Sequence, residues 1–448
     1  MGDSEALTDL GNVRRLVAHH GDDLRFVSAW STWLCWDGRR WARDETGEVM
    51  RRAKATARAL THEAVELPES RAREEHLRHA LRSEQHRALV AMVELAKTEP
   101  GISARVTDLD SDPWVLNVQN GTLDLRTLEL RPHQREDGLT RCCAVPFDAD
   151  ACDDTFARFV ERILPDAETQ YFVQRALGYS LLGVPREEVL FFVHGPPASG
   201  KSTLLEGVKR ALGDYATTAD FETFLQRRDG GPRPDIARLA GVRFVASVEV
   251  DDGKRLAAGL VKTLTGGDTV TARFLYGRDF EFRPAFKLWL AANDEPRVSD
   301  ADDALWRRIL EVPFAESIPE AERDPAVKAA LTDPEQCGAA LLAWMVAGLR
   351  EYLADGLRPP AAVRRATDAY RARMDPLTEW WDERIEVAPE ASATVGELFA
   401  SYLAWAEGAG VRKPMSPKSF GQRLTKRGFG AQPDAAHTRI GIRPRCTR

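Results

Sequence analysis

The distribution of apolar positions along the chain predicts an α/β domain in its middle. Three short, mostly apolar runs lie at 187–195 (EEVLFFVHG), 242–248 (VRFVASV) and 286–292 (FKLWLAA). Runs of this kind are typical of strands that a parallel sheet buries on both faces. Helix-patterned segments separate the runs, and strands that alternate with helices indicate a parallel sheet with helices on both faces.

The first third of the chain predicts a mixture of short strands and helices. Segment 33–47 has two short apolar runs around Asp37-Gly38, a dipeptide typical of hairpin turns. Segment 114–132 alternates around an Asn120-Gly121 turn, so further short strands are expected there. One helical face is expected to hold Phe156, Phe159, Val160, Ile163 and Leu164. The sequence thus predicts an α+β domain over residues 1–165.

Glycine and proline mark the remaining boundaries. A helix around Leu341 ends at Gly356, and prolines interrupt the helical pattern after it. The predicted parts are an α/β domain over 166–358, a linker over 359–376 and a small separate domain over 377–448.

Charge is distributed unevenly along the chain. The whole chain carries −7, whereas 411–448 holds ten Lys/Arg and one acid, a net +9, which leaves −16 on residues 1–410. A basic end on an acidic body indicates contact with a polyanion. The six cysteines show no CxxC spacing, so structural zinc is not expected. No apolar run reaches the roughly 18 residues of a membrane span, and no signal pattern is present, so we expect a cytoplasmic protein with reduced thiols.

Residues 193–203, VHGPPASGKST, have the spacing of a phosphate-binding loop. Its glycines allow backbone N–H groups to point at phosphate oxygens, and a buried strand before it and a helix after it supply the required context. Lys201 is expected to reach the β- and γ-phosphates, and Ser202 to ligate Mg²⁺. The predicted nucleotide-binding residues are Gly195, Pro196, Pro197, Ala198, Ser199, Gly200, Lys201, Ser202 and Thr203. Kinases, GTPases and motor proteins share such loops, so the loop alone does not identify the reaction.

Polar side chains follow the second and third apolar runs. Glu249 comes directly after the second run and Asn293 after the third. Ligands gather at the carboxyl ends of strands in open α/β sheets, so we expect Glu249 to bind the metal or orient the attacking water. Asp251 is expected to share the metal, with Asp252 as the alternative. Asn293 is expected to hold the water against the γ-phosphate. A solvated acidic loop and an ordinary turn are the alternatives.

Arg307 and Arg308 lie side by side near the end of the predicted α/β domain. A helix that begins near Ser299 would direct them to different faces, about 100° apart. One arginine would pair locally. The other would reach the γ-phosphate bound to another subunit as an arginine finger, because that role needs a permanently charged planar donor. Two ordinary surface arginines are the alternative.

The order of these motifs resembles one family. Residues 186–314 resemble the superfamily 3 helicases of viruses, phages and plasmids, and segment 260–294 resembles the phage and plasmid primase–helicase branch in particular. Poxviral replicative helicases are more distant relatives. Segments 33–44 and 116–132 are similar to the N-terminal helicase-associated domain of that branch, and 377–448 is similar to its winged helix. Unlike many relatives, the chain is expected to lack a fused primase domain.

The resemblance implies an AAA+-like core in a ring, usually a hexamer, with ATP and Mg²⁺ bound between subunits. Lys201, Ser202, Glu249 and Asn293 are implied to act from one subunit. Arg307 is implied to act from the neighbour, because it holds the family's position seven residues before Phe314, and Arg308 is the alternative.

Segment 270–282 alternates around YGRD and predicts a β-hairpin. In the family this hairpin projects into the ring channel and contacts the nucleic-acid backbone. Arg273 and Arg278 are therefore expected to contact phosphates of single-stranded DNA, and Tyr276 to stack on a base. The alternative is an ordinary turn in which Tyr276 packs.

The basic end predicts a second DNA contact. Ser416 is a helix N-cap signal, and Phe420 and Leu424 form an apolar seam on the helix that follows. The helix residues expected to contact duplex DNA are Lys418, Arg423, Lys426 and Arg427. Arg439 and Arg443 have the spacing of a wing strand that follows. A solvated basic face is the alternative.

These observations together give the hypothesis of an ATP-dependent replicative DNA helicase of a phage, plasmid or other mobile element, in the host cytoplasm. A separate primase is a candidate partner. The alternative is an origin-binding initiator that melts or remodels duplex DNA with little processive unwinding. A small-molecule kinase leaves the hairpin, Arg307 and the basic end unexplained.

Overall fold

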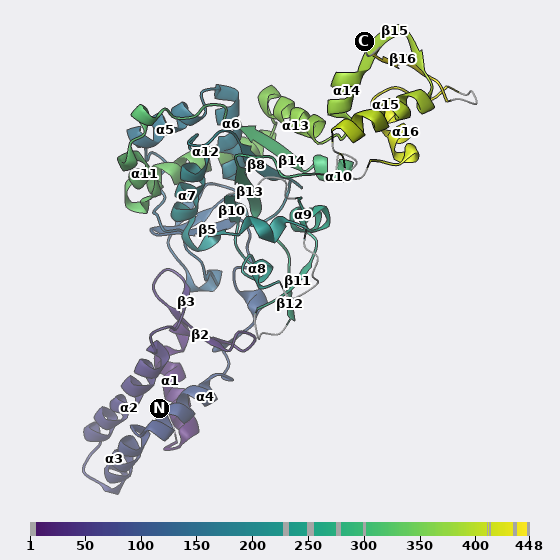
Figure 1. Cartoon of the computed structure of the whole chain (residues 1–448). Coiled ribbons are helices and arrows are strands. Elements are labelled where there is room, and N and C mark those ends of the chain that lie inside the picture. Colours follow the sequence, from purple (N-terminus) through teal and green to yellow (C-terminus); the bar gives the residue numbers. More distant parts are fainter. Residues whose placement is uncertain are drawn as a thin grey trace. The chain divides into compact units, whose positions relative to one another are not determined.

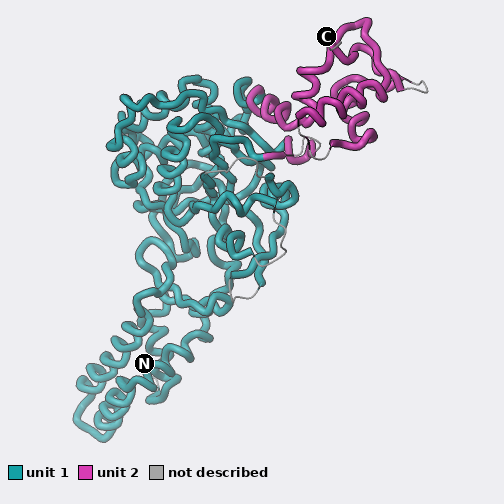
Figure 2. The backbone as a smooth tube through the Cα atoms, in the orientation of Figure 1, with its two compact units in different colours: residues 1–296, 307–364 teal, residues 297–306, 365–448 magenta. Residues whose placement is uncertain are grey.

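The computed structural model (Figure 1) describes residues 6–226, 233–248, 255–274, 279–298, 302–409, 411, 414–432 and 437–445. The chain divides into unit 1, Met1–Pro296 with Arg307–Arg364, and unit 2, Arg297–Trp306 with Arg365–Arg448 (Figure 2). Short 3₁₀ turns are η1 Gly21–Asp23, η2 Val106–Asp108, η3 Arg135–Asp137, η4 Gly213–Tyr215, η5 Phe221–Phe224 and η6 Glu320–Glu322, and η7 Pro334–Gly338 is a π turn.

Unit 1 begins with helices beside a small sheet. The helices are α1 Asp9–His20, α2 Glu48–Glu66, α3 Arg71–Ser83 and α4 His86–Ala96. The strands are β1 Leu24–Val27, β2 Thr32–Trp36, β3 Trp41–Arg43 and β4 Ser103–Ala104. The expected hairpin is confirmed, since β2 and β3 pair antiparallel and Gly38 between them has a φ of 94°. Helix α1 was not predicted, and its Val13 and Leu16 share a buried cluster with Met92 of α4.

A second antiparallel sheet follows, with strands β5 Val115–Val118, β6 Gly121–Asp124 and β7 Glu129–Arg131. Val118 pairs with Gly121, so the chain turns at Asn120-Gly121 as the sequence predicts. Helices α5 Asp154–Ile163 and α6 Ala167–Tyr179 come next. The predicted apolar face of α5 is buried, which confirms that helix.

The middle of unit 1 is a five-stranded parallel sheet in the order β14-β8-β13-β10-β9. Its strands are β8 Leu190–His194, β9 Ala216–Thr218, β10 Phe244–Val248, β13 Lys287–Ala292 and β14 Ile309–Pro313. Its helices are α7 Lys201–Leu212, α8 Pro234–Ala237, α9 Ala258–Thr265, α11 Pro325–Thr332 and α12 Ala339–Asp355. All six residues of β13 are buried, so both faces of that strand are covered. The expected parallel sheet is confirmed.

The strand order determines which residues meet at the carboxyl edge of this sheet. Strand β13 follows β10 in sequence but lies between β8 and β10. His194 therefore pairs with Ala292, and Val248 pairs with Ala291. The phosphate loop, the end of β10 and Asn293 consequently share one edge.

Helices α6 and α12 cross at two glycines. A Cβ on Gly178 would lie 2.2 Å from the Leu349 nitrogen, and one on Gly348 would lie 2.1 Å from the Gln174 oxygen. Only glycine permits this approach of the two backbones. Within the described residues, one helix, Pro334–Asp355, is long and apolar enough to span a membrane, but 61% of its apolar window is buried in the fold. That burial is what a core helix requires.

Two cations are buried at the amino ends of β10 and β13. Arg243 donates to the carbonyl oxygens of Leu181 and Val115, each at 2.7 Å. Lys287 donates to the carbonyl oxygen of Leu182, and burial moves the pKa of its ammonium well below the usual value. Because buried charges need acceptors, these contacts tie β5 and the segment after α6 to the central sheet.

The expected β-hairpin is present as β11 Val270–Arg273 and β12 Asp279–Phe282. The two strands pair antiparallel, with Val270 opposite Phe282 and Arg273 opposite Asp279. Tyr276 and Arg278 lie outside the described residues.

Unit 2 is a small domain with its own core. Its elements are α10 Asp303–Trp306, most of α13 Ala361–Arg373, α14 Thr378–Arg384, β15 Ile385–Ala393, α15 Val395–Gly408, α16 Pro417–Lys426 and β16 Arg439–Pro444. Strands β15 and β16 pair antiparallel, and Trp380, Phe420 and Leu424 are buried between the helices. The predicted cap of α16 is confirmed, since the Ser416 side chain accepts from the Ser419 N–H. The predicted linker contains α13, whose Tyr370 is buried.

The glycine crossing gives the first prediction. Gly178→Ala forces α6 away from α12, so we expect it to lower the free energy of unfolding of unit 1 by roughly 1–3 kcal/mol, measured by guanidinium unfolding. Gly259→Ala in α9 is the control, because a Cβ there meets nothing within 4 Å. Equal unfolding midpoints for the two variants would contradict the prediction.

Candidate functional site

The phosphate loop connects β8 to α7, which is the strand–loop–helix context that the sequence predicts. A Cβ on Gly195 would lie 2.0 Å from the Phe314 carbonyl oxygen, and one on Gly200 would lie 2.4 Å from Ile163 Cγ2. Gly200 also has a φ of 86°. Both positions therefore need glycine, and they fix the loop against the segment after β14 and against α5.

Lys201 points back into this loop. Its Nζ donates to the carbonyl oxygens of Gly195 at 2.7 Å and Pro196 at 2.8 Å, and to Ser199 Oγ at 3.0 Å. A fourth acceptor is Asn293 Oδ1 at 3.1 Å. Burial lowers the pKa of the lysine. The ammonium is thus fixed by oxygen atoms at the place where the backbone N–H groups of the loop can receive an anion.

Lys201 and Asn293 were both predicted to belong to the site and lie far apart in the sequence. The strand order brings them together. They line one pocket of about 210 Å³ with Val248, the last residue of β10. Ser202 is the second residue of α7 and is exposed. The predicted acids Glu249, Asp251 and Asp252 lie outside the described residues, so the structure gives no geometry for them.

A larger cavity of about 980 Å³ adjoins the loop at Ala198, Gly200 and Thr203. Apolar side chains from α5 and from the segment after β14 line it, together with the basic residues Arg158, Arg162, Arg323 and Lys328. Sequence reasoning missed this cavity. No local pattern signals it, because its walls come from segments far apart in the chain.

The structure separates the two neighbouring arginines. The expectation of a helix that carries both is wrong, because α10 ends at Trp306 and the two arginines form the turn that leads into β14 at Ile309. Arg308 pairs with Glu188, and its carbonyl oxygen accepts from the Leu190 N–H at 2.7 Å. Arg307 is exposed.

The hairpin strands carry both charged and aromatic side chains. Arg273 is 3.6 Å from Asp279 of the opposite strand, and its side chain is 44% exposed. Phe274 is 49% exposed and stacks on Phe280, with ring centres 5.4 Å apart.

The basic residues of unit 2 differ in their surroundings. Lys418 is exposed. Arg423 and Arg427 lie 3.3 and 2.6 Å from the same carboxylate, Asp375, and only 16% and 23% of their side chains are exposed. Lys426 lies 3.6 Å from Asp303 and is 52% exposed. The four basic residues predicted to contact DNA therefore do not form a single solvent-exposed surface.

Arg439 begins β16, so the strand expected there is present, but this arginine does not face solvent. Its side chain is buried and donates to the carbonyl oxygens of Phe429 at 2.7 Å and Gly421 at 3.1 Å. The spacing of the two arginines along the strand could not show which of them is exposed and which is buried. Arg443, four residues further along β16, pairs with Glu386 of β15 at 2.9 Å.

Comparison with known families gives two matches. Residues 13–165 match the family described as "D5 N terminal like", and residues 193–308 match a family of unknown function, DUF5906. The chain is 28% identical over 291 residues to "Putative helicase L207/L206" of Acanthamoeba polyphaga mimivirus, which covers 60% of this chain and 30% of that protein. It is 26% identical over 152 residues to "Primase D5" of Fowlpox virus, which covers 33% of this chain and 19% of that protein. The chain thus spans less than a third of either relative.

Among solved structures, the apo structure of the NrS-1 C terminal region matches 96% of this chain and 88% of that chain, with a TM-score of 0.51 and 10% identity. At this identity the likeness is one of fold alone.

The shared carboxylate in unit 2 gives the second prediction. Asp375→Asn leaves two partly buried guanidinium groups without their anionic partner, so we expect unit 2 to lose roughly 1–3 kcal/mol of unfolding free energy. Hydrogen exchange of the unit 2 amides at increasing denaturant concentration measures this loss. Asp382→Asn on exposed α14 surface is the control. The prediction fails if both variants unfold at the wild-type midpoint.

Proposed function

Because the chain belongs to the D5-like superfamily 3 helicase family, we propose that it is an ATP-dependent DNA helicase that serves the replication of a virus, phage, plasmid or other mobile element. The observation that carries the proposal is the contact of Lys201 Nζ with Asn293 Oδ1 at 3.1 Å. It joins the cation of a phosphate loop to an amide suited to hold the water that attacks a γ-phosphate.

In this proposal ATP binds at the carboxyl edge of the central sheet. The loop N–H groups and Lys201 hold the phosphates. The adjoining cavity of about 980 Å³ takes the nucleoside, since it combines the apolar walls of Phe159 and Val327 with basic side chains.

Ser202 and Glu249, with Asp251 or Asp252, hold Mg²⁺ in this proposal. Their hydroxyl and carboxylate oxygens are the ligands that Mg²⁺ prefers. Ser202 is exposed at the start of α7, and the residue before Glu249 lines the same pocket as Lys201, so the donor set fits. When bound, Mg²⁺ would neutralise charge on the phosphates.

The second half of each ATP site comes from a neighbouring copy of the chain. Arg307 supplies the finger, because it is exposed while Arg308 is engaged by Glu188. A donor that every subunit supplies to the next is consistent with a closed ring, and a hexamer is the expected size. Such a ring encloses one DNA strand.

Two surfaces contact DNA. The hairpin of β11 and β12 presents Arg273 to the phosphates of the strand in the channel, and Arg278 is proposed from the sequence to contact them as well. Unit 2 acts as a winged helix, in which α16 presents Lys418 and Lys426 to duplex DNA. Arg423 and Arg427 contribute only if phosphate replaces Asp375 as their partner. A separate primase is the expected partner, and the host cytoplasm the expected location.

Nucleotide chemistry gives the third prediction. Lys201→Ala and Arg307→Ala should each lower the kcat of single-stranded DNA-stimulated ATP hydrolysis by roughly 1,000-fold and abolish fork unwinding. The control is Lys209→Ala, on the same helix but paired with Glu206. Wild-type ATP hydrolysis that single-stranded DNA does not stimulate would contradict the helicase and favour an origin-melting initiator.

Mixing the two inactive variants tests the finger directly. A Lys201→Ala subunit still carries Arg307, and an Arg307→Ala subunit still carries Lys201, so mixed rings should recover hydrolysis at the interfaces that combine the two intact halves. No recovery upon mixing would overturn the assignment of Arg307 to the neighbour's site.

DNA contact by unit 2 gives the fourth prediction. Lys418→Ala should weaken duplex binding and reduce the slope of log K against log salt by about 1, as expected for one lost phosphate contact. Fluorescence anisotropy of a labelled duplex against the full chain measures this slope. Arg350→Ala, exposed on α12, is the control. An unchanged slope would remove Lys418 from the DNA surface.

A further inference from the structure

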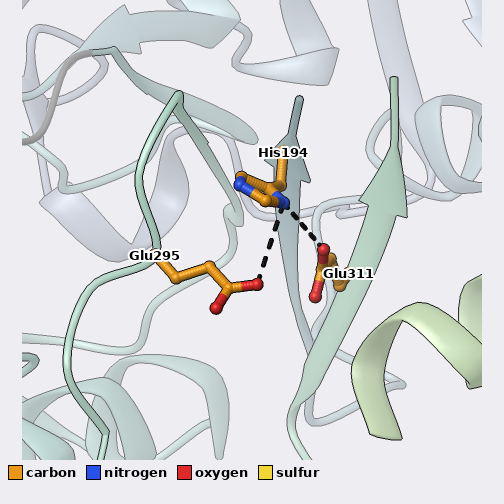
Figure 3. A group of neighbouring side chains, drawn as sticks. All are labelled: His194, Glu295 and Glu311. Atoms are coloured by element: carbon orange, nitrogen blue, oxygen red, sulfur yellow. Dashed lines mark hydrogen bonds and ion pairs between the residues drawn. The ribbon is translucent and has the colours of Figure 1, made fainter. Parts of the chain in front are cut away.

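His194 lies between three elements at the edge of the nucleotide site (Figure 3). It is the last residue of β8, directly before the phosphate loop. Its Nδ1 is 2.9 Å from Glu311 Oε1 of β14 and 3.8 Å from Glu295 Oε1, which follows β13. Its Nε2 is 3.1 Å from the Asn293 carbonyl oxygen. The two carboxylates are almost completely buried, with 3% and 9% of their side chains exposed.

The partners of the ring determine where its protons are. The Asn293 carbonyl only accepts hydrogen bonds, so Nε2 carries a proton. When Nδ1 is protonated as well, it donates to Glu311 Oε1, and the imidazolium donates in two directions. The hydrogen bond that the ring donates to Glu311 raises the pKa of His194, against the lowering effect of burial.

These two hydrogen bonds connect the nucleotide site to the strand that follows Arg307. On one side, Asn293 accepts from Lys201 through Oδ1 and from His194 through its main chain. On the other side, Glu311 is in β14, which begins at Ile309, two residues after Arg307. The sequence carries a signal for this pair, since Glu311 is the one charged residue in that strand.

We propose that His194 is a positioning residue that couples nucleotide occupancy at Lys201 and Asn293 to the placement of Arg307 through β14. The inference rests on the proposed function and adds to it a route by which one subunit's ATP site adjusts the finger aimed at the next. When a γ-phosphate draws Lys201 and Asn293, the Asn293 carbonyl shifts. The doubly bound imidazolium carries that shift to Glu311 and hence to β14.

The coupling has a defined pH dependence. Among the described residues the charged groups that face the ring are Glu311 and Glu295, and both favour the protonated form. Because the pKa of His194 is raised above its ordinary value of 6.5, both hydrogen bonds are complete below pH 6.5. As the pH rises through the raised pKa, the ring loses one proton and keeps one N–H, so one of the two hydrogen bonds is lost. The coupling between the nucleotide site and Arg307 should therefore weaken at pH values above the pKa of His194.

The experiment measures ATP hydrolysis by the full chain from about pH 5.5 to about pH 9, across the range in which histidine titrates. His194→Gln retains one donor but cannot become charged. We expect it to lower kcat by roughly 10-fold at the acid end, to leave KM for ATP within about 2-fold, and to remove the alkaline fall. In a ring the Hill coefficient for ATP should also drop towards 1. A purely structural role would not flatten the pH profile.

Glu311→Gln provides a second, independent variant from another strand. Without the carboxylate the pKa of His194 loses its main upward cause, so the alkaline fall should move to lower pH. His133→Gln is the control, because His133 is a partly buried histidine of unit 1 in the loop after β7. NMR of chain labelled with ¹⁵N-histidine follows the His194 ring itself, and the resonance is the one missing from His194→Gln.

The outcomes separate the inference from the proposed function. A wild-type chain that hydrolyses no ATP contradicts the proposed function and the inference with it. Hydrolysis with the same pH profile in all variants overturns the inference alone, as does a His194 ring that titrates below the ordinary histidine value. Stoichiometric binding of Zn²⁺ or Mn²⁺ alone, lost in His194→Gln, would mean that a metal ion and not a proton joins these groups, and would also overturn it.

Discussion

The parallel alignment of five buried strands is the constraint on which the rest of this structure depends. Parallel strands that are covered on both faces release their chains at the same edge. The residues that leave the sheet there come from β8, β10, β13 and β14. Because β13 lies between β8 and β10, Asn293 meets Lys201 although 92 residues separate them.

The same constraint explains how much the sequence predicts. A strand buried on both faces must be apolar throughout, so β8, β10 and β13 are visible as runs, and the polar residue after each run is visible as a candidate. Turns and helix caps can be predicted from the sequence as well. Gly38 in the first hairpin and Ser416 at the start of α16 act through their nearest neighbours, and both behave as predicted.

Interactions between segments that are distant in the sequence cannot be predicted from such local patterns. The cavity beside Gly200 has walls from α5 and from residues after β14, and neither wall has a pattern of its own. The prediction of DNA contacts from the charge of unit 2 was incomplete for a related reason. A count of basic residues does not include Asp375, which engages Arg423 and Arg427 from outside the basic segment. Arg307 was placed on a helix because a pattern of charges cannot show how soon the chain must extend into β14.

The buried cations Arg243 and Lys287 bear on how this protein can be divided. One matched family ends at residue 165, yet Arg243 of the central sheet donates to the Val115 carbonyl of the earlier antiparallel sheet. A boundary in sequence similarity is therefore not an energetic boundary here. An exchange of the first 165 residues with an unrelated module would leave a buried guanidinium without one of its acceptors. Such recombinants should be selected against unless a matching carbonyl arrives with the new module, so the two segments are expected to be inherited together.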